Sequence, residues 1–347
     1  MFSELILLTG ATGFVGFKTL VTALKTGHRV RCAIRSKSGI DKILAAPSIQ
    51  GLRPTNEQLS WVVVPDVLAP GAYDEAVKGV DYIIHCASPV PTFGKDERKG
   101  TDDEIYVNPA VGGVVGMLTS AAAHAVNTVR RVVVTSSIVA VVPIECFVGK
   151  GLDRPAFDGE SRVATPVAPY GSGFGAYCAS KAAALNASEA WMKEHCPAFD
   201  LVSTVPAWIW GHDELSTTAE ALPSGSNSVL IEYLRGKKSN VPINANFVSV
   251  DDVAAAHVRA LSPSTFGKQG YFLGRPVSME NARDIAKKNF PQAFANGVFS
   301  DTGVQPTVDI PTGTSEGEKL LGREFVSGKD MVRDVAGQFL QLVGGRE

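Results

Sequence analysis

Short apolar runs alternate with longer amphipathic stretches along the first part of the chain. The apolar runs are rich in Val, Ile and Leu and only a few residues long: Leu5–Leu8, Arg29–Ile34, Trp61–Val64, Tyr82–Ile84, Val132–Thr135 and Leu201–Val205. The stretches between them that we expect to form helices are Val15–Lys25, Tyr73–Lys78, Asp103–Ala125 and Ala176–Glu194. Uninterrupted apolar strands separated by helices are typical of a parallel sheet that is buried on both faces. The pattern therefore predicts an α/β fold with a doubly wound parallel sheet.

The pattern changes after Pro206. Residues 213–227 are polar and rich in Ser, Thr and Gly, and the order of the elements beyond them is irregular. The helices expected there are Val250–Leu261, Met279–Asn289 and Gly328–Leu342. We therefore predict a sheet domain over residues 1–206 and a smaller C-terminal α/β substrate lobe over residues 207–347. Within that lobe, the chain is expected to return to the edge of the sheet near residues 245–262.

Composition narrows the class of protein. Hydrophobic residues make up 45% of the 347 positions and the formal net charge is −2, which favours a soluble globular protein over a disordered one. Basic side chains come at most in pairs, so we expect neither a nucleic acid nor a membrane as partner. The 5 scattered cysteines and 6 histidines lack metal-ligand spacing, which predicts no metal site and no disulfide framework. With no segment that reads as a signal peptide or a membrane span, the expected location is the cytoplasm.

A glycine-rich turn follows the first apolar run, where residues 9–16 read Thr-Gly-Ala-Thr-Gly-Phe-Val-Gly. In such a turn the first glycine permits a tight bend, the second lets phosphate oxygens approach the backbone, and the third lets the helix pack close to the strand. The N-terminus of the following helix offers N–H groups to a pyrophosphate. This context predicts a dinucleotide site made by Gly10, Thr12, Gly13, Phe14, Val15 and Gly16.

The ends of the next strands predict which dinucleotide is bound. Enzymes that use NAD place a carboxylate after the second strand, but this chain has Arg35 and Lys37 there and no acidic residue before Asp41. A guanidinium favours a 2′-phosphate, so NADP(H) is the expected cofactor; the alternative is that Arg35 is one more solvated charge. Further contacts to the cofactor are expected from residues at later strand ends, namely Asp66, Val67, Ala87, Ser88 and Thr135.

Tyr177 and Lys181 lie four residues apart on an expected helix, so that their side chains face the same way. A free Tyr, with a pKa near ~10, is a poor acid–base catalyst at neutral pH, and a nearby ammonium lowers that pKa toward the working range. The strand Val132–Thr135 runs into Ser136 and Ser137, either of which could hydrogen-bond a substrate carbonyl oxygen. These groups predict a site for acid–base chemistry at a carbonyl.

Together these motifs resemble the extended short-chain dehydrogenase/reductases, and within them the dihydroflavonol and cinnamoyl-CoA reductases and the fungal aldehyde/ketone reductases. The resemblance spans nearly the whole chain and rests on residues 9–16, 33–36, 109–113, 134–137, 177–181, 247–254 and 319–322. It implies a Rossmann-type sheet in which Tyr177 is the acid and Lys181 binds the nicotinamide ribose and lowers the pKa of Tyr177. It also implies that Ser137, the second serine of the pair, is catalytic and that Pro206 lies in the segment that cradles the nicotinamide.

The resemblance predicts an NADPH-dependent reductase, monomeric or homodimeric, that transfers hydride to the carbonyl of a ketone or aldehyde on a hydrophobic small molecule. Apolar candidates for the substrate pocket are Val90, Val142, Phe174 and Trp208. The chain departs from its relatives at Gly211-His212, where a Gly-Pro pair is usual, and in the long segment Gly151–Gly175. Both departures leave the identity of the substrate open.

Two alternatives keep the fold and change the function. The first is a sugar-nucleotide epimerase or dehydratase with tightly held NAD. Arg35 counts against it, and so does the Ser136–Ser137 pair, since sugar dehydratases usually carry Asp-Glu there. The second is a non-enzymatic dinucleotide sensor, which would be expected to lose the pair formed by Tyr177 and Lys181.

Overall fold

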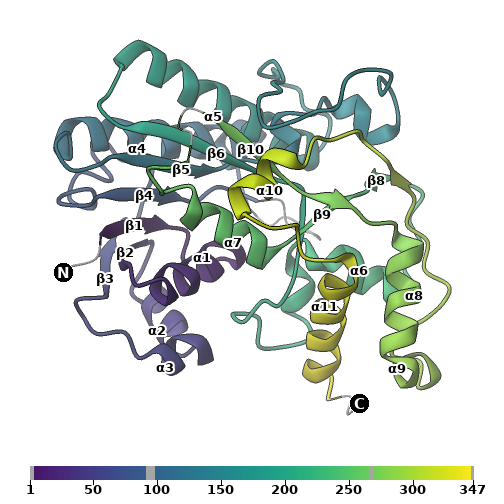
Figure 1. The fold of residues 1–347 in the computed structure, drawn as a ribbon. Helices are drawn as coiled ribbons and strands as arrows, with labels where there is room; N and C mark the ends of the chain where they lie inside the picture. The colour runs from purple at the N-terminus through teal and green to yellow at the C-terminus, as the bar shows by residue number, and fades with distance from the viewer. Residues whose placement is uncertain (1–3, 91–97, 266, 268, 345–347) are drawn as a thin grey trace.

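A parallel sheet of seven strands forms the centre of the protein, as the computed structural model in Figure 1 shows. The structure describes residues 4–90, 98–265, 267 and 269–344. The strands lie in the order β10-β6-β5-β4-β1-β2-β3 and all neighbours run parallel. They are β1 (Leu5–Thr9), β2 (Arg29–Ile34), β3 (Leu59–Val63), β4 (Tyr82–His85), β5 (Arg131–Thr135), β6 (Asp200–Pro206) and β10 (Gly270–Leu273). The predicted α/β class with a doubly wound parallel sheet is confirmed.

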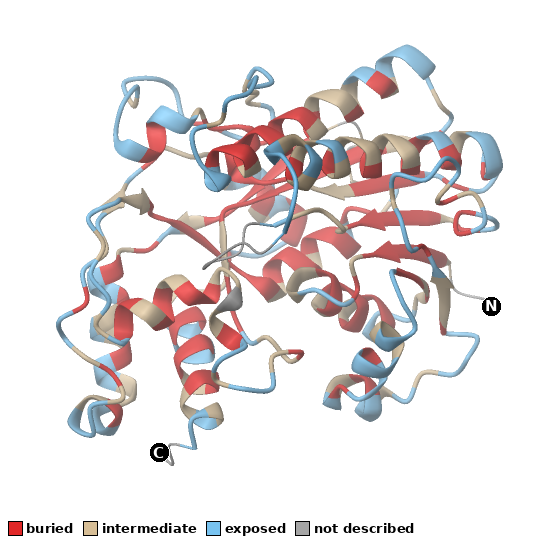
Figure 2. Cartoon of the chain, turned by 180° about the vertical axis from the view of Figure 1, so that it is seen from behind, coloured by how far each residue is buried: buried red, intermediate tan, exposed pale blue. Residues whose placement is uncertain are grey.

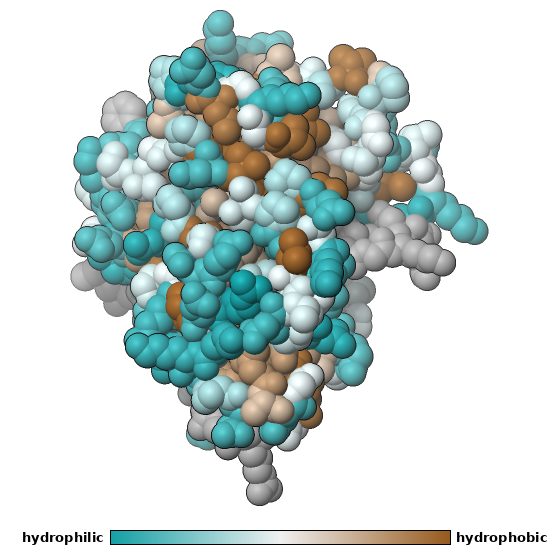
Figure 3. Space-filling view, turned by 90° about the vertical axis from the view of Figure 1, so that its right-hand side faces the viewer, coloured by the Kyte–Doolittle hydropathy of each residue, from teal (hydrophilic) through white to brown (hydrophobic). Residues whose placement is uncertain are grey.

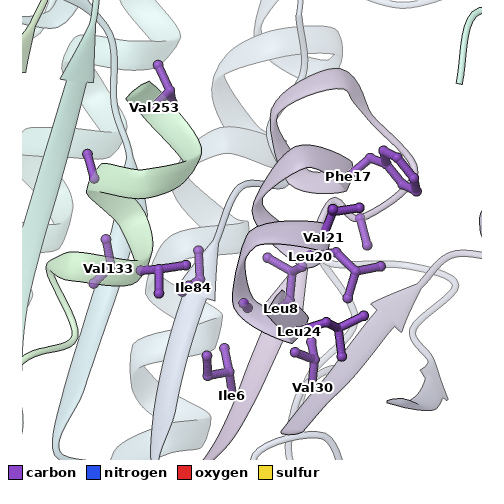
Figure 4. Close-up of a cluster of buried hydrophobic side chains, with 14 of the residues drawn as sticks. Ile6, Leu8, Phe17, Leu20, Val21, Leu24, Val30, Ile84, Val133 and Val253 are labelled. Carbon is purple, nitrogen blue, oxygen red and sulfur yellow. The ribbon is translucent and has the colours of Figure 1, made fainter. Parts of the chain in front are cut away.

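Helices cover both faces of this sheet. On one face α1 (Phe14–Lys25) packs against α7 (Val250–Arg259), and on the other α4 (Asn108–His124) packs against α5 (Gly173–His195). In the first layer, Leu20 of α1 and Val253 of α7 belong to the cluster that Figure 4 shows over the sheet. Because both faces are covered, the strands β1, β4 and β10 are buried along their length (Figure 2), which agrees with their apolar sequences, whereas the edge strand β3 is only partly buried.

The order of the strands reverses beside β1. The chain adds β2 and β3 on one side of β1, then crosses over to lay β4, β5 and β6 on the other side. In open α/β sheets, ligands bind at such a reversal, outside the carboxyl ends of the strands. The ends of β1 and β4, where Thr9 lies opposite His85, therefore mark the expected position of a site.

One predicted helix is absent. Residues 71–79 form successive turns between Gly71 and Gly79, both of which have positive φ angles (67° and 69°). Within them the Val77 N–H donates to the Tyr73 carbonyl at 3.0 Å, the hydrogen bond of a single helical turn. Tyr73 and Val77 are nevertheless buried, so this segment packs as the predicted helix would have packed.

The remaining elements are shorter. A three-stranded sheet is formed by β7 (Trp208–Trp210), β9 (Asn246–Ser249) and β11 (Arg275–Pro276), and a two-stranded sheet by β8 (Ile243–Asn244) and β12 (Thr307–Val308). The other α-helices are α2 (Ser38–Leu44), α3 (Pro47–Leu52), α6 (Asn227–Leu234), α8 (Met279–Asn289), α9 (Pro291–Ala295), α10 (Ser315–Leu321) and α11 (Gly328–Leu342). From the side of α8 the surface is mainly hydrophilic, with apolar side chains gathered in the upper part of the view (Figure 3).

The chain beyond Pro206 contributes to both parts of the molecule. Its helices α6, α8 and α11 enclose a cluster of their own, whereas α7 packs on α1 and β10 is an edge strand of the main sheet. The division at residue 206 stays a prediction.

The helical stretch Asp103–His124 is long and apolar enough to cross a membrane by length and composition alone. It begins with a π-helical turn at Asp103–Val107 and continues as α4. Val114, Met117 and Leu118 of α4 are buried in the cluster that contains Ile83 of β4, so in this fold the helix packs onto the sheet.

Candidate active site

The glycine-rich turn joins β1 to α1 and lies against the end of β4. Gly10 has a φ of +76°, and a Cβ placed on it would lie 2.8 Å from the Ala87 N atom. A Cβ on Gly16 would overlap the Gly10 carbonyl oxygen, far inside the sum of the two van der Waals radii. Gly13 precedes α1, and no side chain caps the start of this helix. The N–H groups of the first turn, including those of Phe14 and Val15, therefore suit a pyrophosphate, so the residues present fit a dinucleotide.

His85 and Thr9 hold the two strand ends together. The Thr9 hydroxyl oxygen lies 3.0 Å from His85 Nδ1 and accepts the Ala87 N–H at 3.1 Å. Burial, and to a smaller degree the charge of Lys181, lowers the pKa of His85 to about 4, so the ring is neutral at physiological pH. This arrangement fixes Ala87 beside the glycine-rich turn, and Ser88 follows it into the pocket described below.

The start of α2, just beyond the loop that follows β2, lies against the same turn, since a Cβ on Gly39 would come within 2.9 Å of the Thr12 methyl carbon. Arg35 and Lys37 are both exposed at the start of this loop, and no ion pair among the described residues engages Arg35. The carboxylate of Asp66, after β3, is also exposed and accepts the Leu68 N–H at 2.9 Å. Its neighbour Val67 is half-buried. The roles of these residues toward a cofactor stay predictions.

The predicted catalytic side chains come together where β5 ends. The Lys181 ammonium donates to the Thr135 carbonyl oxygen at 3.2 Å and lies 6.0 Å from the centre of the Tyr177 ring. The side chain of Ser137 hydrogen-bonds Tyr177. Lys181 and Ser137 are buried, with 6% and 8% of their surfaces exposed. Pro206 ends the neighbouring strand β6 and is buried.

Burial dominates the electrostatics of this group. It raises the pKa of Tyr177 to about 12, against the opposing effect of the hydrogen bond from Ser137. Ser137 is the neighbour that opposes this rise, and the lowering of the Tyr177 pKa by Lys181 stays a prediction. Burial also lowers the pKa of Lys181 to about 8. Tyr177 therefore holds its proton across the physiological range, as an acid that protonates a developing alkoxide must.

A pocket lies between the ends of β4 and β5 and the helices α4 and α5. Its walls include Ala87, Ser88, Thr135, Ser136, Lys181 and Ser188. Ser136 is buried, and its hydroxyl has no hydrogen-bond partner among the described residues. The two serines thus differ: Ser137 contacts Tyr177, whereas Ser136 lines this pocket on the Lys181 side.

The four apolar substrate candidates occupy different surroundings. Phe174 is 36% exposed, and its ring centre lies 6.4 Å from that of Tyr177, so it can extend the site outward. Val90 is 61% exposed and follows the end of β4. Val142 is 1% exposed within a packed cluster, which places it in the core instead of on the site surface. Trp208 is half-buried against the cluster of α6, α8 and α11.

Two contacts at the site were not foreseen from the sequence. His257 Nε2 of α7 lies 2.7 Å from the Thr135 hydroxyl and 3.0 Å from that of Thr204. A signal was present, since His257 stands four residues after Val253 and seven after Val250, on the apolar face of an amphipathic helix. A polar side chain on a buried face needs a hydrogen-bond partner.

Comparisons with known proteins identify the family. A family model described as the NAD dependent epimerase/dehydratase family matches residues 6–273. Ketoreductase CTB6 of Cercospora nicotianae is 34% identical, over 99% of this chain and 96% of that protein. The NAD-dependent epimerase/dehydratase ALT6 of Alternaria alternata is 34% identical, over 98% of each chain.

Solved structures share the fold. Yeast methylglyoxal/isovaleraldehyde reductase Gre2 complexed with NADPH superposes with a TM-score of 0.80 at 25% identity, over 99% of this chain and 100% of that one. Vestitone reductase from alfalfa has a TM-score of 0.72 at 23% identity, over 99% and 100% of the two chains. The resemblance to extended short-chain dehydrogenase/reductases is thereby confirmed, and the chain belongs to the NAD dependent epimerase/dehydratase family.

Proposed function

We propose that the protein is an NADPH-dependent reductase that transfers hydride to the carbonyl carbon of a ketone or aldehyde on a hydrophobic small molecule. The observation that carries this proposal is the convergence of Ser137, Tyr177 and Lys181 at the end of β5. The relatives named as ketoreductases and the NADPH-complexed yeast reductase support it.

The residues of the glycine-rich turn would hold the pyrophosphate, and Arg35 would pair with the 2′-phosphate. Lys181 would hydrogen-bond the nicotinamide ribose. When bound, the cofactor supplies the hydride. Because the Arg35 guanidinium is exposed at the end of β2, it can reach a phosphate group without leaving a buried partner unpaired.

The protein's own groups would manage the carbonyl oxygen and the proton. The hydroxyls of Ser137 and Tyr177 would donate to the carbonyl oxygen and stabilise the negative charge that develops on it. Tyr177, with a pKa raised to about 12 by burial, would then transfer its proton to the alkoxide. The Lys181 ammonium would stabilise the phenolate left behind until solvent returns a proton. Phe174 would offer an apolar surface to the remainder of the substrate.

The test is NADPH consumption with a panel of aryl ketones, aldehydes and diketones. We expect turnover by the wild-type protein, and a loss of about 10²–10⁴-fold in kcat for Tyr177→Phe with NADPH affinity unchanged, since that range is typical of general acid catalysis. A Tyr177→Phe variant that reduces ketones at the wild-type rate would show that another group supplies the proton.

An epimerase or dehydratase is the second candidate, because the matching family and one relative carry that name. Arg35 and the Ser136–Ser137 pair argue against it. Purified protein that keeps NAD⁺ through dialysis and does not oxidise NADPH would favour this alternative. NADPH bound at a 1:1 ratio, without turnover of any carbonyl in the panel, would instead favour a sensor.

A further inference from the structure

His257 lies on the sheet-facing side of α7, and its tautomer follows from its contacts. Its Nδ1 atom is 2.7 Å from the Val253 carbonyl oxygen. Because a carbonyl oxygen can only accept, Nδ1 must carry the proton. Complete burial lowers the pKa of His257 to about 4, so the ring is neutral and Nε2 is left as an acceptor.

That acceptor faces the end of β5. Nε2 is 2.7 Å from the Thr135 hydroxyl oxygen, so the Thr135 hydroxyl donates to it. The Thr204 hydroxyl is 3.0 Å away and has the Val134 carbonyl oxygen, at 3.4 Å, as another acceptor. The Thr135 hydroxyl also reaches the Cys86 sulfur, a weak acceptor, so His257 Nε2 is its strong acceptor; Thr204 has a carbonyl oxygen as its alternative.

Thr135 forms hydrogen bonds with helices on both faces of the sheet. Its side chain bonds to α7 on one face of the sheet, and its carbonyl oxygen accepts the Lys181 ammonium of α5, on the other face, at 3.2 Å (Figure 1). A continuous line of hydrogen bonds therefore runs from His257 through Thr135 to Lys181.

Other groups around Lys181 do not replace this contact. The titratable neighbours are His85 and Cys86 at the end of β4 and Tyr177 on its own helix. Burial raises the pKa of the Cys86 thiol to about 11, so it is neutral, and His85 and Tyr177 are neutral as well. The packed helix α4 presents only Ala110 and Val114 to the pocket.

We propose that His257 is a positioning residue, which holds Thr135 so that its carbonyl oxygen fixes the Lys181 ammonium for cofactor binding and proton transfer. The inference rests on the proposed function. It assigns His257 no contact with substrate or cofactor.

Four variants distinguish a role of His257 in positioning Thr135 from a role in core packing alone. His257→Leu removes the acceptor, His257→Gln supplies an amide oxygen in its place, and Thr135→Val removes the same hydrogen bond from the other side. Thr204→Val is the matched control, because it deletes a buried hydroxyl next to the same ring and leaves Thr135 bonded. The readouts are NADPH affinity by fluorescence, kcat and KM, and the pH dependence of kcat/KM.

We expect His257→Leu and Thr135→Val to lower kcat by about tenfold and weaken NADPH binding severalfold, since small misplacements of a catalytic group are costly. When the Thr135 carbonyl oxygen is no longer held in place, the Lys181 ammonium is less stable. The pKa of Lys181 then falls below about 8, and activity is lost at a lower pH than in the wild type. His257→Gln should restore most of both properties. The proposal would be overturned if the loss of kcat/KM at alkaline pH occurred at the wild-type pH in His257→Leu and Thr135→Val. It would also be overturned if Thr204→Val moved that loss to lower pH by the same amount.

A measurement on the wild-type protein needs only His257→Gln, for assignment of the signal, and does not depend on the folding of His257→Leu or Thr135→Val. With ¹⁵N-labelled histidine, the signal that His257→Gln removes from the 6 histidines should report a neutral Nδ1–H tautomer down to about pH 5. An Nε2–H tautomer, or titration near ~6.5, would refute the hydrogen-bond line. If the wild type reduces no carbonyl while the tautomer and the NADPH-affinity pattern hold, the proposed function fails and the positioning of Lys181 stands.

Discussion

Replacing Gly10 by alanine tests whether the glycine-rich turn is built as described. The residue has a φ of +76°, a conformation that costs an L-residue with a Cβ about 1–2 kcal/mol. The added Cβ would also lie 2.8 Å from the Ala87 N atom and 3.0 Å from the Cys86 carbonyl carbon. Both neighbours are backbone atoms, so relief requires β1 and β4 to separate at their ends.

Overpacking of a well-packed interior costs about 1–3 kcal/mol, and with the backbone strain we expect the free energy of unfolding to fall by about 2–5 kcal/mol. The shift would also move Ala87, whose N–H the Thr9 hydroxyl accepts, and so disturb the predicted cofactor surface. We therefore expect NADPH to bind about tenfold more weakly or worse. Denaturant unfolding and NADPH fluorescence titration measure the two effects.

Two other glycines provide controls. A Cβ on Gly13 would make an ordinary contact of 3.5 Å with the Gly10 carbonyl oxygen, so Gly13→Ala should cost less than about 1 kcal/mol yet weaken NADPH binding, because phosphate oxygens would approach there. Gly51 has nothing within 4 Å, so Gly51→Ala should match the wild type in NADPH affinity. Wild-type stability and affinity in Gly10→Ala would refute the account of this turn.

Three further changes have defined outcomes. Arg35→Asp should shift cofactor preference from NADPH toward NADH in kcat/KM, and unchanged selectivity would remove Arg35 from the 2′-phosphate site. Phe174→Ala should raise KM for aryl ketones about fivefold, the equivalent of about 1 kcal/mol of aromatic contact, with little change for small aldehydes; an equal effect on both classes would contradict its placement beside the substrate. Arg323 pairs at 2.6 Å with Asp252, which is buried and has a raised pKa. Arg323→Met should therefore cost about 1–3 kcal/mol at pH 7, measured by denaturant unfolding. Because it leaves that carboxylate without its cation and raises its pKa further, the loss should shrink as acidification protonates Asp252 in the folded variant, at a pH above the ordinary Asp value of about 4; a loss that is independent of pH would exclude the ion pair as its cause.

The sequence was most informative where one local pattern determines one structure. The apolar runs became parallel strands, and the spacing of Gly10, Gly13 and Gly16 gave the turn, because strand burial and backbone sterics are local properties. The short strand β10 (Gly270–Leu273) was not foreseen, since it lies in the irregular C-terminal part of the chain and its pairing with β6 joins residues distant in the chain. The helix predicted at Tyr73–Lys78 failed because its apolar residues pack on the sheet through turns instead of a regular helix.

The electrostatics of the site depended on burial, which no local pattern reveals. The spacing of Tyr177 and Lys181 correctly placed them on one helix, but it suggested a phenol acidified by its neighbour. In the structure both groups are desolvated, so the pKa of Tyr177 rises and that of Lys181 falls. The choice between Ser136 and Ser137 likewise depends on which hydroxyl reaches Tyr177, and adjacent residues in an extended segment point in opposite directions.

His85 and His257 each hydrogen-bond the hydroxyl of a threonine that ends a strand, at two places along the sheet. At the carboxyl end of a parallel sheet the backbone hydrogen bonds between strands end. The polar groups of the last residues in each strand must then hydrogen-bond to other parts of the protein or to a ligand. His85 pairs with Thr9 where β1 meets β4, and His257 pairs with Thr135 where β5 meets β6. Each ring is buried and has a pKa lowered to about 4, so it acts as a neutral hydrogen-bonding group and not as a charge. Because these rings fix the strand ends without adding charge, Lys181 remains the cation at the end of β5, where the proposed reaction needs one.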